Sequence, residues 1–177
     1  MRNTLTSEKM KRIGIFYGST TGTTAEVAAE IAKKLGVADA DVHDVASTAP
    51  HALGDYDIIL AGTSTWGNGE LQEDWYDFVD GLGALDLRGK TVAVFGCGDQ
   101  TMSETFCNAV GELHERFART GATMTGDFPA TEYNYNHSRA ADGALMRGLV
   151  LDQVNHPEYT DGRIDRWLKE VSEAIAG

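Results

Sequence analysis

The sequence of 177 residues contains only two cysteines, Cys97 and Cys107, and they form no CxxC pair. Its five histidines are scattered, with neither HxH nor HExxH spacing. Structural metal sites need clustered ligands, and disulfide frameworks need regularly spaced cysteines. We therefore expect no metal centre and no disulfide, and we interpret both cysteines as small buried residues.

Long hydrophobic runs and an excess of positive charge are also missing. No apolar stretch reaches the roughly 18 to 20 residues that cross a bilayer, and the polar segment 1–11 lacks the apolar core of a signal peptide. The net charge is -12, from 15 basic and 27 acidic residues. Nucleic acids and anionic membranes bind basic surfaces, so we expect neither as a partner. We expect a cytoplasmic monomer with a flexible leader, 1–11, and one domain, 12–177.

Apolar runs alternate with amphipathic stretches along the chain. The apolar runs predict strands at 12–17, 41–45, 56–62 and 90–96, and a fifth strand that begins near 122, is interrupted, and resumes at 148–152. Apolar residues at helical spacing predict helices at 24–35, 74–82, 104–119 and 161–176. A polar and aromatic insertion, 131–144, separates the two parts of the fifth strand.

The fold class follows from this order and from the character of the strands. Strands 56–62 and 90–96 are nearly uniformly apolar, which is typical of a parallel sheet covered by helices on both faces. The alternation predicts an α/β fold, a doubly wound five-stranded parallel sheet. Ligands of such sheets bind outside the carboxyl ends of the strands. The loops after residues 17, 62 and 96 are therefore the candidate site.

The first of these loops, 18–24, reads Gly-Ser-Thr-Thr-Gly-Thr-Thr and leads into a helix. Free N–H groups and the dipole at a helix N-terminus bind anions, and five hydroxyls can add donors. The loop lacks the lysine of the nucleoside-triphosphate motif and does not match GxGxxG. A simple helix cap would need only one hydroxyl residue. The pattern favours a phosphate monoester bound by hydrogen bonds alone.

The other two loops suit a planar group. In 63–71, Trp66 stands among hydroxyls and glycines beyond a buried strand, where it can stack on a planar ligand. The alternative is a tryptophan that covers the edge of the sheet. In 96–103, two glycines allow close approach of the backbone, and Asp99 with Gln100 can pair polar edges. Together the loops indicate a planar heteroaromatic molecule with a single phosphate.

These motifs resemble those of the flavodoxin family, over residues 11–177. Residues 18–24 resemble its phosphate loop, 65–71 its first flavin loop, and 96–100 its second flavin loop. The insertion resembles that of the long-chain branch. The resemblance implies the strand order 2-1-3-4-5 known for flavodoxins, with FMN at the switch point. It also implies a one-electron carrier, not an enzyme, that exchanges electrons with a reductase and an acceptor enzyme.

The resemblance implies particular roles for these residues. The hydroxyl residues of 18–24 would hold the phosphate, Trp66 would stack on the flavin, and Asp99 or its backbone would reach the pyrimidine edge. The Gly67 carbonyl would turn toward flavin N5 in the one-electron-reduced state. The full set of expected cofactor-binding residues is Ser19, Thr20, Thr21, Gly22, Thr23, Thr24, Thr63, Ser64, Thr65, Trp66, Gly67, Asn68, Gly69, Gly96, Cys97, Gly98, Asp99, Gln100, Met102 and Ser103.

Two positions depart from the family pattern. Thr23 replaces the usual asparagine of the phosphate loop. The second flavin loop lacks the usual stacking tyrosine and offers Met102 and Ser103 instead. Methionine sulfur can pack on an aromatic ring, but we expect weaker FMN binding than with tyrosine.

Two other functions remain as alternatives. A flavodoxin-like NAD(P)H:quinone reductase would need a nicotinamide pocket, and the loops carry no added basic residue for a dinucleotide. A receiver domain would need carboxylates after the first and third strands, where this chain has Tyr17-Gly18 and Gly62-Thr63.

Overall fold

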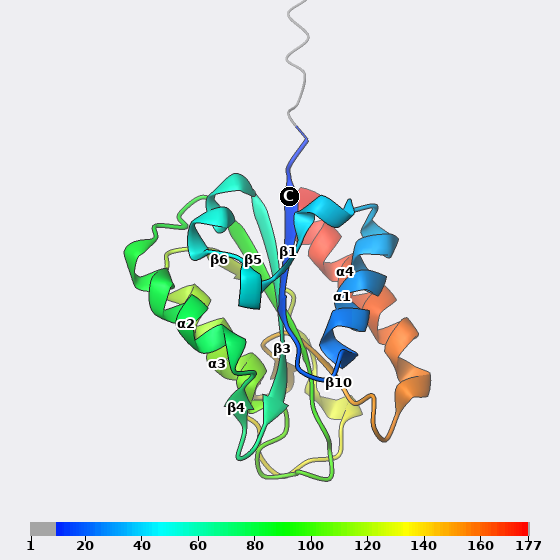
Figure 1. The fold of residues 1–177 in the computed structure, drawn as a ribbon. Helices are drawn as coiled ribbons and strands as arrows, with labels where there is room; N and C mark the ends of the chain where they lie inside the picture. Colours follow the sequence, from blue (N-terminus) through cyan, green and yellow to red (C-terminus); the bar gives the residue numbers. More distant parts are fainter. Residues whose placement is uncertain (1–9, 177) are drawn as a thin grey trace, which may run out of the picture.

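The computed structural model describes residues 10–176, so the expected leader lies almost entirely outside the described residues. A parallel sheet with strand order β10-β5-β3-β1-β2 forms its centre (Figure 1). Its strands are β1 (Ile13–Gly18), β2 (Val42–Asp44), β3 (Ile58–Trp66), β5 (Thr91–Cys97) and β10 (Leu149–Leu151). Counted along the chain, this is the order 2-1-3-4-5, and the expected fold class is confirmed.

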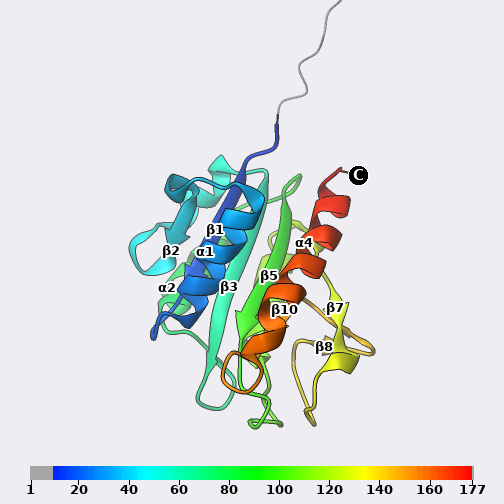
Figure 2. The same ribbon diagram turned by 90° about the vertical axis from the view of Figure 1, so that its right-hand side faces the viewer.

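Helices cover both faces of the sheet, as Figures 1 and 2 show. One face carries α1 and α4, and the other carries α2 and α3. The helices are α1 (Thr23–Leu35), α2 (Asp74–Asp80), α3 (Asn108–Ala118) and α4 (Thr160–Ala176). The central strands β3 and β5 are buried on both faces, which explains why their sequences are apolar without alternation. Among residues 10–176, no helix is long and apolar enough to span a membrane.

The third helix is shorter than its apolar spacing suggests. Residues 104–107 were predicted to be helical, but α3 begins only at Asn108. Cys107, directly before it, has a φ of +50°, a left-handed conformation that an α-helix does not contain. The carbonyl oxygen of Ser103 accepts two N–H groups of the insertion, at 2.9 and 2.8 Å. These tertiary contacts hold the segment before α3 in turns.

The third strand is longer than predicted, because it continues into a hairpin. β3 extends to Trp66 and pairs antiparallel with β4 (Glu70–Leu71). The predicted loop 63–71 is therefore a strand end, a tight turn and a short return strand. Thr65 pairs with Leu71, and this pairing keeps the residues before the turn extended.

The fifth strand is split as predicted. β6 (Thr123–Thr125) pairs with the first half of β5, and β10 pairs with its second half. The break spans residues 126–148, which is longer than the predicted insertion. It contains a small sheet of β7 (Phe128–Pro129), β9 (Leu145–Met146) and β8 (Ala141–Asp142), which lies beside the β10 edge in Figure 2.

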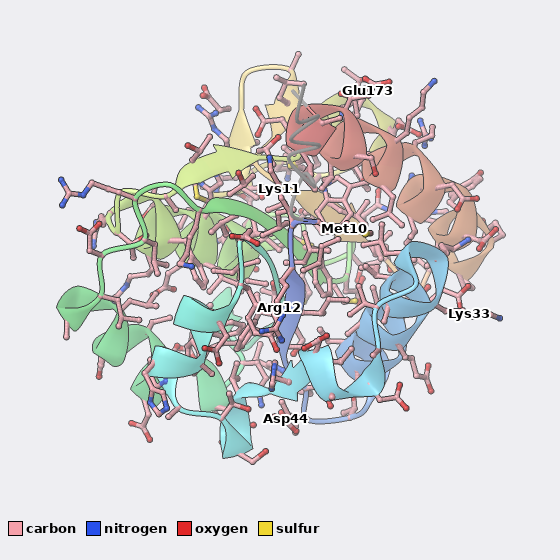
Figure 3. The ribbon with its side chains drawn as sticks, turned by 90° about the horizontal axis from the view of Figure 1, so that it is seen from above. Met10, Lys11, Arg12, Lys33, Asp44 and Glu173 are labelled. Atoms are coloured by element: carbon pink, nitrogen blue, oxygen red, sulfur yellow. The ribbon has the colours of Figure 1, made fainter. Side chains whose placement is uncertain are left out.

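Two basic residues make contacts with distant parts of the chain at the amino ends of the strands. This end of the sheet faces the viewer in Figure 3. The Lys11 Nζ donates to the carbonyl oxygen of Ile175 at 2.9 Å, near the end of α4. Arg12 contacts the Asp41 carboxylate at 3.1 Å. These contacts lie at the opposite end of the sheet from the three candidate loops (Figures 1 and 3).

A half-buried histidine on α3 makes the stability dependent on pH. Burial, and then the charge of Arg147, lower the pKa of His114 from its ordinary value of 6.5. The unfolded chain therefore binds a proton at a higher pH than the folded chain does. We expect folding stability to fall as the pH drops below about 6.5, down to the lowered pKa, and His114→Gln to remove this part of the loss. Urea unfolding of both proteins between pH 7 and pH 5 measures the difference, and parallel curves would contradict it.

Candidate functional site

The phosphate loop, 18–24, connects the end of β1 to the start of α1. Gly22 precedes the helix with a φ of +93°, and its N–H donates to the Ser19 hydroxyl at 3.1 Å. This turn leaves the first N–H groups of α1, which have no partner within the helix, at the carboxyl edge of the sheet. The loop contains no acidic residue that could compete with an anion for its donors, and no basic residue that could pair with the anion.

One hydroxyl of the phosphate loop is buried without a hydrogen bond. Thr24, in the first turn of α1, is 0% exposed, and its Oγ1 has no partner among the described residues. The hydroxyl lies beside the Cys97 thiol, and a thiol sulfur is only a weak hydrogen-bonding group. Buried hydroxyls are paired in most proteins, because an unpaired one costs about 1 to 3 kcal/mol. An orphaned donor at a helix N-terminus is what a bound anion would satisfy.

The loop 63–71, which contains the expected first flavin loop 65–71, turns tightly between β3 and β4. The Gly69 N–H donates to the carbonyl oxygen of Trp66 at 3.0 Å, and the φ of Gly67 is +52° while that of Asn68 is not positive. This is the pattern of a type II′ turn, which requires glycine at its first central position. Trp66 is 40% exposed, and its indole N–H donates to the Ser64 hydroxyl at 2.7 Å. The indole is thus oriented without being part of the core.

The loop 96–103, which contains the expected second flavin loop 96–100, differs from the expectation for Gln100. Its side chain is nearly buried: Nε2 donates to Asp152 at 3.2 Å, and Oε1 accepts the Asn134 N–H at 2.6 Å. Both polar ends of this amide are used within the protein, so the side chain does not offer an edge to a ligand. Asp99 stays at the rim, where its carboxylate accepts from Thr101 and Asn155.

The two flavin loops meet around a small cavity of about 40 Å³. Four of the expected residues line it, together with three that were not expected. The expected ones are Thr65, Gly67, Asp99 and Met102, and the others are Thr105, Phe106 and Cys107. Met102 is 52% exposed at its rim, and the buried Thr65 Oγ1 has no hydrogen-bond partner in the described part of the chain. The cavity therefore combines apolar side chains, including one aromatic ring, with polar groups that include an unpaired hydroxyl.

Gln72, which sequence reasoning missed, joins the phosphate loop to the first flavin loop. It is 0% exposed, its backbone N–H donates to the Thr63 hydroxyl at 3.3 Å, and its Nε2 donates to the Thr20 hydroxyl at 3.1 Å. The only signal was a polar residue between the buried Leu71 and the start of α2. With Thr24 beside Cys97, this link brings all three loops together at one end of the sheet.

The two cysteines do not supply a reactive group. Burial raises the pKa of the Cys97 thiol to about 12, and it raises that of the Cys107 thiol well above its ordinary range. Both thiols are free and protonated at neutral pH, and a protonated thiol is a poor nucleophile and metal ligand. Within residues 10–176, no three His, Cys, Asp or Glu side chains are grouped to hold a metal ion.

Larger hollows lie elsewhere on the surface but carry less chemistry. One of about 300 Å³ lies between α1 and α4, and one of about 410 Å³ lies beside His114 and Arg147. Neither combines a helix N-terminus with an aromatic side chain that a planar ligand could contact. The three loops at the carboxyl edge remain the candidate site, even though their cavity is small.

Comparisons with known proteins show the family of the chain. A family model described as Flavodoxin matches residues 15–167. Flavodoxin 1 of Shigella flexneri is 44% identical over 164 residues, which are 92% of this chain and 93% of the relative. The flavodoxin of Klebsiella pneumoniae is 43% identical over 168 residues, which are 94% and 96% of the two chains.

A solved structure extends the similarity to three dimensions. The crystal structure of Fusobacterium nucleatum flavodoxin bound to flavin mononucleotide superposes with a TM-score of 0.87. It is 28% identical and covers 93% of this chain and 99% of its own. The family resemblance is confirmed over nearly the whole chain: this protein belongs to the flavodoxin family.

Proposed function

We propose that this protein binds FMN non-covalently at the three loops and carries single electrons between redox proteins. The observation that carries the proposal is that two sites lie next to each other, one suited to an anion and one suited to a planar ring. A helix N-terminus with an orphaned Thr24 hydroxyl adjoins the loops that surround a cavity lined in part by Met102 and Phe106. FMN has the matching parts, a phosphate monoester and a planar ring.

The phosphate would bind to the 18–24 loop without a counter-cation. Charge-assisted hydrogen bonds from N–H and hydroxyl groups are roughly twice as strong as neutral ones, and they stabilise an anion at a helix N-terminus. Thr24 would donate its unpaired hydroxyl. Thr20, held by Gln72, would face the same anion from the other side of the loop.

The ring would lie between the two flavin loops. Trp66 would stack on one face, and Met102 would cover part of the other, where family members usually have tyrosine. Thr65 would donate its orphaned hydroxyl to a polar atom of the ligand, and the backbone at Asp99 would meet the polar edge of the ring. These residues would exclude water from the inner part of the ring while leaving its rim accessible.

FMN supplies the redox chemistry when bound, and the protein supplies orientation and electrostatics. The three loops hold no basic side chain, so nothing nearby stabilises an added negative charge on the ring. The Gly67 peptide can turn at low cost because glycine adopts positive φ freely. Its carbonyl oxygen would accept a hydrogen bond from flavin N5 once that atom carries a proton. Together these effects would separate the two one-electron steps.

The partners follow from the charge and the family. A net charge of -12 favours encounter with basic surfaces, and long-range attraction raises association rates. We propose a reductase as electron donor and an electron-accepting enzyme as the recipient, both with basic docking surfaces. The protein would act as a monomer in the cytoplasm.

Stepwise anaerobic reduction of the FMN-loaded protein, followed by visible absorption, tests the function. We expect two separate one-electron steps, with a long-wavelength band that rises over the first electron equivalent and falls over the second. Bleaching in a single two-electron step, together with turnover of NAD(P)H and a quinone, would instead support the quinone-reductase alternative. A purified protein that takes up no added FMN would contradict the proposal.

Replacing Met102 with tyrosine tests the departure from the family pattern. We expect Met102→Tyr to bind FMN more tightly, by up to about tenfold, because an aromatic stack adds roughly 0.5 to 1.5 kcal/mol. The side chain is half exposed at the rim of the cavity, so a larger ring can be accommodated. Quenching of flavin fluorescence gives both dissociation constants. Equal affinity in the two proteins would show that the second face of the ring lies elsewhere.

A further inference from the structure

A buried carboxylate lies directly beneath the second flavin loop. Asp152 follows β10 and is 0% exposed. Its Oδ2 accepts the backbone N–H of Gln100 at 3.1 Å, the Gln100 Nε2 at 3.2 Å and the Asn155 Nδ2 at 2.9 Å. Its Oδ1 accepts the N–H groups of Val154 and Asn155 at 3.2 and 2.9 Å. Every one of these partners is a donor, so both oxygens act as acceptors.

No cation neutralises this carboxylate within the part of the chain that the structure describes. None of the ion pairs of residues 10–176 includes Asp152. The charge is instead held by N–H groups, as buried charges must be if they are not paired. The negative charge of Asp152 also acts on the neighbouring Cys97 thiol. Burial is the main cause of the raised pKa of that thiol, and Asp152 raises it further.

The contacts of Asp152 continue into the rest of the loop. The Asn155 amide that binds Asp152 also donates to the Asp99 carboxylate at 2.7 Å. Gln100 also contacts the insertion, because its Oε1 accepts a hydrogen bond from the Asn134 N–H. Two adjacent residues of the second flavin loop, Asp99 and Gln100, are thus fixed by one buried group.

We propose that Asp152 is a positioning residue of the FMN site, which holds the second flavin loop in its ligand-ready conformation through Gln100 and Asn155. This inference rests on the proposed function. Fixing a loop before the ligand arrives reduces the entropy lost on binding, so the preorganised loop binds more tightly. The carboxylate has a second effect, because an uncompensated negative charge near the ring opposes the addition of another one.

Two substitutions separate anchoring from charge. Asp152→Asn removes the charge and places an NH2 group against one of the two sets of N–H donors, so it also weakens the anchor. Gln100→Leu removes the side-chain anchor but keeps the carboxylate and its charge. Asp39→Asn is the matched control, since it removes an exposed carboxylate at the amino end of β2, away from the loops.

We expect the FMN dissociation constant to rise about tenfold or more in Asp152→Asn and Gln100→Leu, and to stay unchanged in Asp39→Asn. The dissociation constant of the double variant Asp152→Asn/Gln100→Leu should be at most about twofold above that of the weaker-binding single variant. Both substitutions break the same side-chain contact, so their effects should not add. In the apoprotein, hydrogen exchange of the Gln100 and Thr101 amides should become faster in both variants. The potential of the second electron step should shift positive in Asp152→Asn only, which a merely structural role would not produce.

Wild-type affinity and wild-type exchange in both single variants would overturn the proposal, as would additive losses in the double variant. If Asp152→Asn does not fold, as judged by far-ultraviolet circular dichroism, Gln100→Leu decides the question alone. Failure of the wild-type protein to bind FMN would overturn the proposed function instead. The exchange comparison in the apoprotein would then still decide whether Asp152 anchors the loop.

Discussion

Thr24→Val is expected to weaken FMN binding by about 10- to 150-fold while leaving the apoprotein as stable as before or slightly more stable. A hydrogen bond to a charged group contributes about 1.5 to 3 kcal/mol, which corresponds to this range of affinity. Valine has the shape of threonine and keeps the branched side chain that packs at the start of α1. The hydroxyl has no hydrogen-bond partner among residues 10–176, so its removal leaves no described group unpaired.

The opposite effects on affinity and stability make this prediction specific. If Thr24 held the fold together, its loss would lower the free energy of unfolding, whereas removal of an unsatisfied buried hydroxyl raises it or leaves it unchanged. Thr24→Ser is the matched control, because it keeps the hydroxyl and should retain most of the affinity. Flavin fluorescence titration and urea unfolding of the apoproteins give the two quantities. Wild-type affinity in Thr24→Val would show that this hydroxyl does not contact the phosphate.

Trp75→Ala is expected to lower the free energy of unfolding by about 3 to 5 kcal/mol, the usual range for removing a buried tryptophan. Trp75 on α2 is 0% exposed and lies edge-on to Phe78 and Phe117, at ring distances of 5.3 and 6.2 Å. Its indole N–H donates to the Gly62 carbonyl oxygen at 2.9 Å. Domains of this size are stable by about 5 to 15 kcal/mol, so the loss is a large fraction of the total.

The same substitution at Trp66 is the natural control. Trp66 is 40% exposed and lies outside the core, so Trp66→Ala should change stability by no more than about 1 kcal/mol. It should instead weaken FMN binding, whereas Trp75→Ala acts mainly on the fold. Urea unfolding of both apoproteins, followed by far-ultraviolet circular dichroism, measures the contrast. A loss below about 1 kcal/mol in Trp75→Ala would contradict the packing described for α2.

Local patterns were enough to predict most of the architecture. The apolar runs at β3 and β5 and the helical spacing in α4 identify the elements because a buried parallel strand and an amphipathic helix have different periodicities. The carboxyl ends of parallel strands meet at one edge, so the three loops could be assigned to one site before any contact was known. In the structure the two flavin loops line one cavity, and Gln72 connects the phosphate loop to the first of them.

Errors arose where contacts distant in sequence override local preference. The helical pattern of 104–107 has no way of indicating that the insertion binds Ser103 and holds those residues in turns. Gln100 was predicted at the ligand edge from its neighbours alone. Its partners, Asp152 and Asn134, lie 52 and 34 residues away, and nothing in the local sequence points to them.

The sequence by itself therefore determined the fold class, the family and the three loops, because periodicity, glycine placement and a run of hydroxyls are local properties of the chain. Only the tertiary structure decided which side chains face the site and which support it from behind. Within the residues that the structure describes, Thr24 is unpaired, while the amides of Gln100 and Gln72 are used in hydrogen bonds. Whether a polar group is satisfied depends on every neighbour that folding brings to it, and that information is absent from any one segment.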